Sequence, residues 1–115
     1  MHRDVKSDNC LLSHDLTGDR LILADFGLAR ADLLRPPPGH QSPLVGSIGY
    51  LAPERLHTRG DARTDVYAAG VVLFEALTRR LPFRGPQDEV LRQHAEDPPP
   101  CPSRLVDVPR GFDML

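Results

Sequence analysis

Apolar residues come in two short runs near the start of the chain and in one long run past its middle. Residues 10–12 and 21–24 are apolar and flank the turn-forming stretch 14–19, which predicts a β-hairpin with a longer loop. Residues 66–78 are nearly all apolar, which predicts a helix buried on every side that forms the axis of the fold. We expect Thr64 or Asp65 to be the N-cap of this helix.

Prolines mark the boundaries of the remaining segments. Pro53 lies in the first turn of a short helix predicted over residues 53–57, and Pro82 ends the long apolar helix. A more polar helix is predicted over residues 87–95. Prolines within residues 30–46 and 98–102 predict two loops, the first of them long enough to suggest a function or disorder. The predicted class is therefore mainly α with a short β-hairpin.

Composition is that of an ordinary soluble protein and excludes several functions. The chain has 115 residues, 40% hydrophobic and 26% charged, which suits one domain or part of one. A net charge of -2 and an aromatic content of 5% argue against a nucleic-acid partner. The sequence lacks an apolar run of the roughly 20 residues that would span a bilayer, so we expect a cytoplasmic protein, although a longer parent protein could be membrane-anchored.

Cysteines and most histidines do not have metal-ligand spacing. Cys10 and Cys101 are far apart, form no C-x-x-C pair and are expected to be reduced thiols. Four histidines are predicted to be surface residues because their spacing fits no metal site; they are His14, His40, His57 and His94.

The first nine residues contain the strongest chemical pattern. Residues 2–9 read H-R-D-V-K-S-D-N, which fits H-R-D-x-x-x-x-N, and Asp25, Phe26 and Gly27 follow the second apolar run. Phosphoryl transfer needs a carboxylate that takes the proton of the substrate hydroxyl and oxygen ligands for Mg²⁺. A hairpin between the two groups would bring Asp4, Asn9 and Asp25 to one edge.

Three further patterns follow in order. Residues 46–54 read G-S-I-G-Y-L-A-P-E, residues 65–75 read D-V-Y-A-A-G-V-V-L-F-E, and residues 81–83 read L-P-F. Alone, H-R-D is usually a solvated turn and A-P-E is a helix start. Together, in this order and spacing, they resemble the eukaryotic-like protein serine/threonine kinase superfamily over nearly the whole chain. The resemblance implies a fragment of the kinase C-lobe, part of an α+β fold, and the Arg-rich composition resembles bacterial kinases.

The resemblance implies roles for residues around the phosphate. Asp4 would be the catalytic base, and Lys6, the only lysine of the chain, would contact the γ-phosphate. Asn9 and Asp25 would hold Mg²⁺. ATP and Mg²⁺ are therefore the implied cofactors, and a protein with a Ser or Thr acceptor is the implied substrate.

Further roles follow from the same resemblance. Leu11 would form the floor under adenine, and the Ser47 hydroxyl would bridge Asp4 and Lys6. Arg3 would pair with an activation-loop phosphate, for which Ser42 is the one hydroxyl within residues 28–45.

Five residues are implied to be structural. His2 and Phe26 would stack in the spine that links the lobes, beside Gly27. Asp65 would accept backbone N–H bonds from the catalytic loop, although a plain N-cap is an equal reading and it could be both. Glu54 lacks its usual arginine partner in this sequence, which would be costly if the carboxylate were buried.

The sequence contains no glycine-rich loop, β3 lysine or αC glutamate. We therefore interpret residues 1–115 as a partial kinase domain, from the catalytic loop to the helix after the central helix, without the N-lobe and C-terminal helices. We expect the chain alone to be inactive and its central helix to be partly uncovered. The alternatives are a non-catalytic, kinase-like binding module and a non-functional truncated fragment, and the oligomeric state is not predicted.

Overall fold

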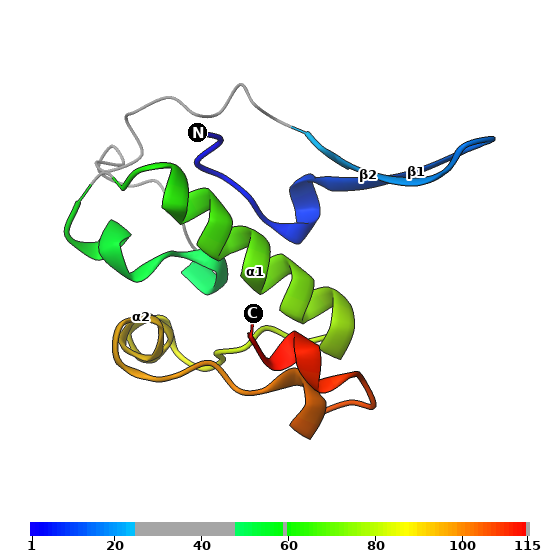
Figure 1. The fold of residues 1–115 in the computed structure, drawn as a ribbon. Coiled ribbons are helices and arrows are strands. Elements are labelled where there is room, and N and C mark those ends of the chain that lie inside the picture. Colours follow the sequence, from blue (N-terminus) through cyan, green and yellow to red (C-terminus); the bar gives the residue numbers. More distant parts are fainter. Residues whose placement is uncertain (25–47, 59, 115) are drawn as a thin grey trace.

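The computed structural model describes residues 1–24, 48–58 and 60–114. Within these residues the chain forms one antiparallel two-stranded sheet, two α-helices and several short 3-10 helices (Figure 1). The predicted class, mainly α with a short β-hairpin, is confirmed. No helix among these residues has both the length and the apolar character that a membrane span requires.

The hairpin is longer and its turn tighter than the sequence predicted. Strand β1, Cys10–Asp15, pairs with strand β2, Gly18–Leu23, and only two residues connect them. The Asp15 carboxylate accepts the backbone N–H of Thr17 at 2.7 Å, and Gly18 has a φ of 120°. Such a side-chain turn, followed by a residue without a Cβ, reverses the chain quickly. Of the polar residues in the predicted loop, His14, Asp15 and Asp19 therefore belong to the strands, and Thr17 stays in the turn.

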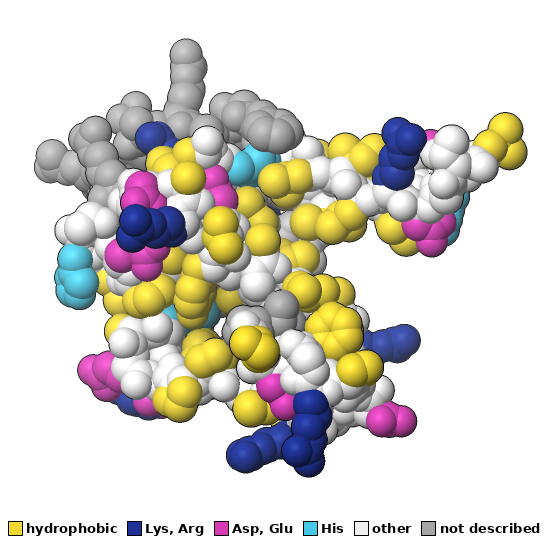
Figure 2. All heavy atoms as spheres, in the orientation of Figure 1, with side chains coloured by type: hydrophobic (Ala, Val, Ile, Leu, Met, Phe, Trp, Pro, Cys, Tyr) yellow, Lys and Arg dark blue, Asp and Glu magenta, His cyan; other side chains and the backbone are white. Residues whose placement is uncertain are grey.

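The hairpin projects from the body of the molecule as an arm (Figures 1 and 2). Large apolar side chains on it remain exposed, among them Leu12, Leu16 and Leu21. Figure 2 shows hydrophobic side chains along this arm.

Helix α1, Ala62–Thr78, begins four residues before the predicted run. Its N-cap is Asp61, whose carboxylate accepts the backbone N–H of Arg63 at 2.8 Å. The predicted N-caps were wrong, because Thr64 and Asp65 both lie inside the helix. The helix ends at Arg79, which adopts a left-handed conformation with a φ of 58°.

One face of α1 is buried and the other is not. The buried residues recur at helical spacing and are Thr64, Ala68, Val71, Phe74 and Thr78. On the opposite side Val66 is 71% exposed and Leu73 is 39% exposed. The prediction of burial on every side is therefore wrong for this chain, whereas the expected partial exposure is present. Apolar composition shows that a helix can be buried, but burial requires neighbours on each side.

Helix α2, Gln87–Glu96, lies where the polar helix was predicted, and the short helix after Ala52 is a 3-10 helix over Pro53–Leu56. Among the residues that the structure describes, the hydrophobic core consists of two clusters. Val5, Tyr50, Ala68 and Val71 form one, and Ile48, Phe83 and Val90 form the other. The 3-10 helix Ile48–Tyr50 contributes to both clusters, so it joins the part of the core at α1 to the part at α2.

His94 is buried rather than on the surface, which corrects the prediction. It is 5% exposed, and its Nδ1 lies 2.6 Å from the Tyr67 hydroxyl. The Phe83 ring meets the imidazole edge-on at 4.9 Å between centroids. Spacing tests for metal ligands do not detect a histidine that packs between elements.

We expect Asp61→Ala to lower the free energy of unfolding by about 1 kcal/mol, because the first turn of α1 loses its side-chain acceptor. Urea denaturation followed by far-UV circular dichroism measures the change. Asp61→Asn keeps a capping oxygen and should stay close to the parent chain. An equal loss in both variants would show that the cap oxygen is not the cause.

Candidate functional site

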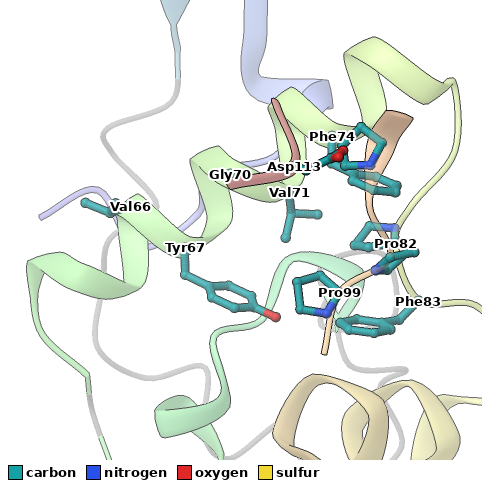
Figure 3. Close-up of a pocket in the computed structure, with 11 residues that line it drawn as sticks. Val66, Tyr67, Gly70, Val71, Phe74, Pro82, Phe83, Pro99 and Asp113 are labelled. Atoms are coloured by element: carbon teal, nitrogen blue, oxygen red, sulfur yellow. The ribbon is translucent and has the colours of Figure 1, made fainter. Parts of the chain in front are cut away.

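An apolar pocket of about 230 Å³ lies between α1 and the chain that follows α2 (Figure 3). Tyr67 and Phe74 line it from α1, and Phe83 and Pro99 line it from the other side. None of the described residues that were predicted to carry chemistry lines this pocket. The candidate site is therefore elsewhere, at the N-terminal loop and the base of the hairpin.

Asp65 holds the start of the N-terminal loop against α1. Its two carboxylate oxygens accept the backbone N–H groups of His2 at 2.6 Å and Arg3 at 2.8 Å. Arg3 has a φ of 70°, a conformation that costs energy for a residue with a side chain. Charge-assisted bonds to two successive N–H groups can hold such a backbone. Asp65 thus contacts the loop, and Asp61 has the capping role.

Asp4 and Lys6 flank a residue that anchors the loop to the core. Val5 is 8% exposed and packs in the cluster with Tyr50 and Val71. On either side of it, the Lys6 ammonium lies 3.2 Å from Asp4 Oδ2, and both side chains keep about a fifth of their surface exposed, 21% and 19%. The pair is therefore fixed by a buried neighbour and open to a ligand.

Asn9 fixes the Asp4 side chain from the other direction. Its amide Nδ2 donates to the Asp4 carbonyl at 2.8 Å and to Asp4 Oδ2 at 3.0 Å. Because both partners are acceptors, the amide nitrogen of Asn9 must face them. The amide oxygen then points away from Asp4 and can accept another bond. Oxygen is the ligand type that Mg²⁺ prefers.

The base of the hairpin closes on the same loop. The Ala24 N–H donates to the Asn9 carbonyl at 2.8 Å, and His2 Nε2 donates to the Ala24 carbonyl at 2.9 Å. The end of β2 is therefore tied to both ends of the motif of residues 2–9. Five predicted site residues lie outside the described residues: Asp25, Phe26, Gly27, Ser42 and Ser47.

A second attachment links the loop to α1 through Tyr50. The Tyr50 hydroxyl donates to Glu75 Oε2 at 2.6 Å and lies 2.8 Å from Ser7 Oγ. Burial, and then the bond to the Glu75 carboxylate, raises the pKa of Tyr50 to about 12. Sequence reasoning did not single out Ser7, Tyr50 or Glu75. The signal available to it was that each is a polar residue inside one of the motif stretches.

The comparisons with known proteins agree on one family. The model of the protein kinase domain matches residues 1–103. The chain is 39% identical over 118 residues to the serine/threonine-protein kinase PknL of Mycobacterium tuberculosis, an alignment that covers 100% of this chain and 29% of PknL. The chain belongs to the protein kinase family.

Other kinases match over most of the chain. Serine/threonine-protein kinase Pkn1 of Myxococcus xanthus is 39% identical over 111 residues, covering 91% of this chain and 16% of Pkn1. Receptor-like protein kinase HSL1 of Arabidopsis thaliana is 45% identical over 84 residues, covering 71% of this chain and 8% of HSL1. The chain thus spans less than a third of the length of these kinases. The predicted membership in the kinase superfamily, with bacterial relatives, is confirmed.

The other described residues of the kinase pattern differ in exposure and in their neighbours. Leu11 on β1 is 54% exposed. Glu54 is exposed, so its carboxylate does not carry the cost of a buried, unpaired charge. Arg3 and Asp65 line a small hollow of about 50 Å³ together with Asp4 and Tyr50.

The magnesium ligands that the kinase pattern implies can be compared with the part of the chain that the structure describes. Within that part, no group of three His, Cys, Asp or Glu side chains could hold a metal ion. The two ligands that the kinase pattern implies are an asparagine, Asn9, and Asp25, which lies outside the described residues. The oxygen of Asn9 fits such a site, because its amide nitrogen is already committed to Asp4.

Proposed function

We propose that this chain carries the catalytic loop of an ATP-dependent protein serine/threonine kinase. The observation that carries the proposal is the convergence on one carboxylate oxygen, Asp4 Oδ2, of the Lys6 ammonium at 3.2 Å and the Asn9 amide at 3.0 Å. A base for a hydroxyl proton, a cation for a phosphate and an oxygen ligand for a metal are the parts that phosphoryl transfer needs.

Each residue of the cluster has a separate role in this proposal. Asp4 accepts the proton of the substrate hydroxyl, and Lys6 contacts the γ-phosphate of ATP. Asn9 and Asp25 hold Mg²⁺, which when bound neutralises charge on the transferred phosphoryl group. Ser47 bridges Asp4 and Lys6 through its hydroxyl.

Further residues shape the nucleotide and regulatory contacts. The exposed Leu11 side chain is the surface on which adenine rests. Arg3 binds a phosphate on the activation loop, with Ser42 as the acceptor. The substrate is a protein with a Ser or Thr hydroxyl. The feature of the loop that favours Ser or Thr over Tyr as the acceptor is the lysine two residues after Asp4. For the location of the protein we propose the cytoplasm.

Phosphate transfer tests the proposal directly. We expect no transfer from radiolabelled ATP by the 115-residue chain alone, because it contains no glycine-rich loop to cover the phosphates. A chimaeric kinase, in which this chain replaces the matching segment of a bacterial relative, should phosphorylate a Ser/Thr substrate. Asp4→Ala in the chimaera should lower the rate about a hundredfold or more, the range for loss of a general base.

Asp8→Ala is the matched control, since Asp8 is an exposed carboxylate in the same loop. Its rate should stay close to that of the chimaera. A folded chimaera that binds ATP without transfer would favour the non-catalytic binding module. Transfer that persists undiminished in Asp4→Ala would overturn the role of Asp4.

A further inference from the structure

The hydroxyl of Ser7 completes a chain of hydrogen bonds whose direction can be assigned. Glu75 is an acceptor, so the 2.6 Å bond from Tyr50 uses the tyrosine proton. Tyr50 Oη then has only lone pairs to offer to Ser7 Oγ, 2.8 Å away, and the serine must be the donor. The order is Ser7 to Tyr50 to Glu75. It links three segments, which are the catalytic loop, the 3-10 helix Ile48–Tyr50 and α1.

The two attachments of the catalytic loop lie far apart along α1. Asp65 and Glu75 are ten positions apart, which corresponds to about 15 Å of helix. Asp65 holds the backbone at residues 2 and 3, and Glu75 holds Ser7 through Tyr50. Asp4 and Lys6 lie between these attachments in the chain. Their side chains are therefore positioned from both sides rather than from one.

Tyr50 also belongs to a segment with its own contacts at α2. Ile48, two residues earlier, is 4% exposed and packs with Phe83 and Val90. Tyr50 itself is 9% exposed and packs with Val5 of the catalytic loop. A displacement of this segment would therefore move both the apolar contact to Val5 and the polar contact to Ser7.

We propose that Ser7 is a positioning residue whose hydroxyl couples the catalytic loop to the segment Ile48–Tyr50, so that the two are ordered together. The role in catalysis rests on the proposed kinase function, because Ser7 acts through the placement of Asp4 and Lys6. The coupling itself is a property of the fold and can be measured without any phosphate transfer.

Amide hydrogen exchange of the full 115-residue chain, read by NMR, tests the coupling. Asn9 and Leu51 report on the two sides, since their N–H groups donate to Lys6 and Ile48 carbonyls at 3.0 and 3.1 Å. Ser7→Ala should raise both exchange rates about threefold to tenfold, the range for one lost hydrogen bond. The N–H groups of Asp97, which follows α2, and of Leu105, which donates to the Pro102 carbonyl, are the reference and should not change.

Two further variants separate coupling from general destabilisation. Ser7→Thr keeps the hydroxyl and should restore the slow exchange at Asn9 and Leu51. In a Tyr50→Phe background, Ser7→Ala should have no further effect, because the acceptor is already gone. Two outcomes would overturn the proposal. One is unchanged exchange rates in Ser7→Ala, and the other is an equal increase at the reference amides and at Asn9 and Leu51 in both Ser7→Ala and Tyr50→Phe. If the exchange pattern holds and the chimaera shows no transfer, the coupling stands and only the kinase function fails.

Discussion

Replacing Asp65 by alanine is expected to lower the free energy of unfolding of this chain by about 3 kcal/mol, because it removes two charge-assisted hydrogen bonds at once. The His2 and Arg3 N–H groups lose their acceptors, and His2 is only 5% exposed. Arg3 also loses what holds its backbone at a φ of 70°. The loop that carries Asp4 should therefore detach from α1.

Urea denaturation gives the stability, and the amide shifts of residues 2–9 show whether the loop moves. Asp65→Asn keeps one acceptor oxygen, so its free energy of unfolding should fall less than that of Asp65→Ala. Asp107→Ala removes an exposed carboxylate and should change the stability by no more than about 0.5 kcal/mol. A loss in Asp65→Ala no larger than that of Asp107→Ala would show that this carboxylate does not hold the loop.

Acidification below neutral pH is expected to destabilise the fold through His94. Burial lowers the pKa of His94 from the ordinary value near 6.5, so the folded chain prefers the neutral ring. The stabilisation is fully present above the unfolded pKa and is lost as the pH falls through the lower, folded pKa. A single proton limits the slope to about 1.4 kcal/mol per pH unit.

The contacts of His94 explain the direction. His94 is 5% exposed, and the Tyr67 hydroxyl that lies 2.6 Å from Nδ1 carries no charge to balance an imidazolium. Burial raises the pKa of Tyr67 to about 12, so the tyrosine keeps its proton throughout this range. A second ring proton would therefore place a positive charge in a buried site beside the Phe83 ring.

Urea midpoints of the parent chain and of His94→Gln, measured between about pH 7.5 and pH 5, check this expectation. The parent should lose stability over the range, and the variant should lose less. His57→Gln removes an exposed histidine and is the matched control. Parallel pH profiles for the parent and His94→Gln would assign the acid sensitivity to another group.

Local patterns predicted the elements well where the signal depends on neighbouring residues. The hairpin, the helix α2 and the short helix after Ala52 all depend on alternation, proline and turn residues within a few positions. The motifs of residues 2–9 and 65–75 also predicted that Asn9 lies near Asp4 and offered Asp65 as an acceptor for the loop backbone, and both contacts are present. The order and spacing of these motifs were sufficient to predict the family, because several short motifs rarely occur together in one arrangement by chance.

Local patterns could not assign the separate roles of Asp61 and Asp65. Both aspartates suit a helix N-terminus, and the sequence left it open whether Asp65 was a cap or an anchor for the loop. In the structure, Asp61 accepts the backbone N–H of Arg63 in the first turn of α1. Asp65 instead accepts the N–H groups of His2 and Arg3, which lie more than 60 positions earlier in the sequence.

By itself the sequence determined which chemical groups this kinase segment contains, in what order, and which stretches form strands or helices. Only the tertiary structure decided that His94 is buried, which face of α1 stays exposed, and that Ser7 reaches Glu75 through Tyr50. The physical reason is the distance along the sequence over which each interaction acts. Backbone preference and turn chemistry act between adjacent residues, whereas burial and hydrogen-bond partners depend on segments that folding brings together.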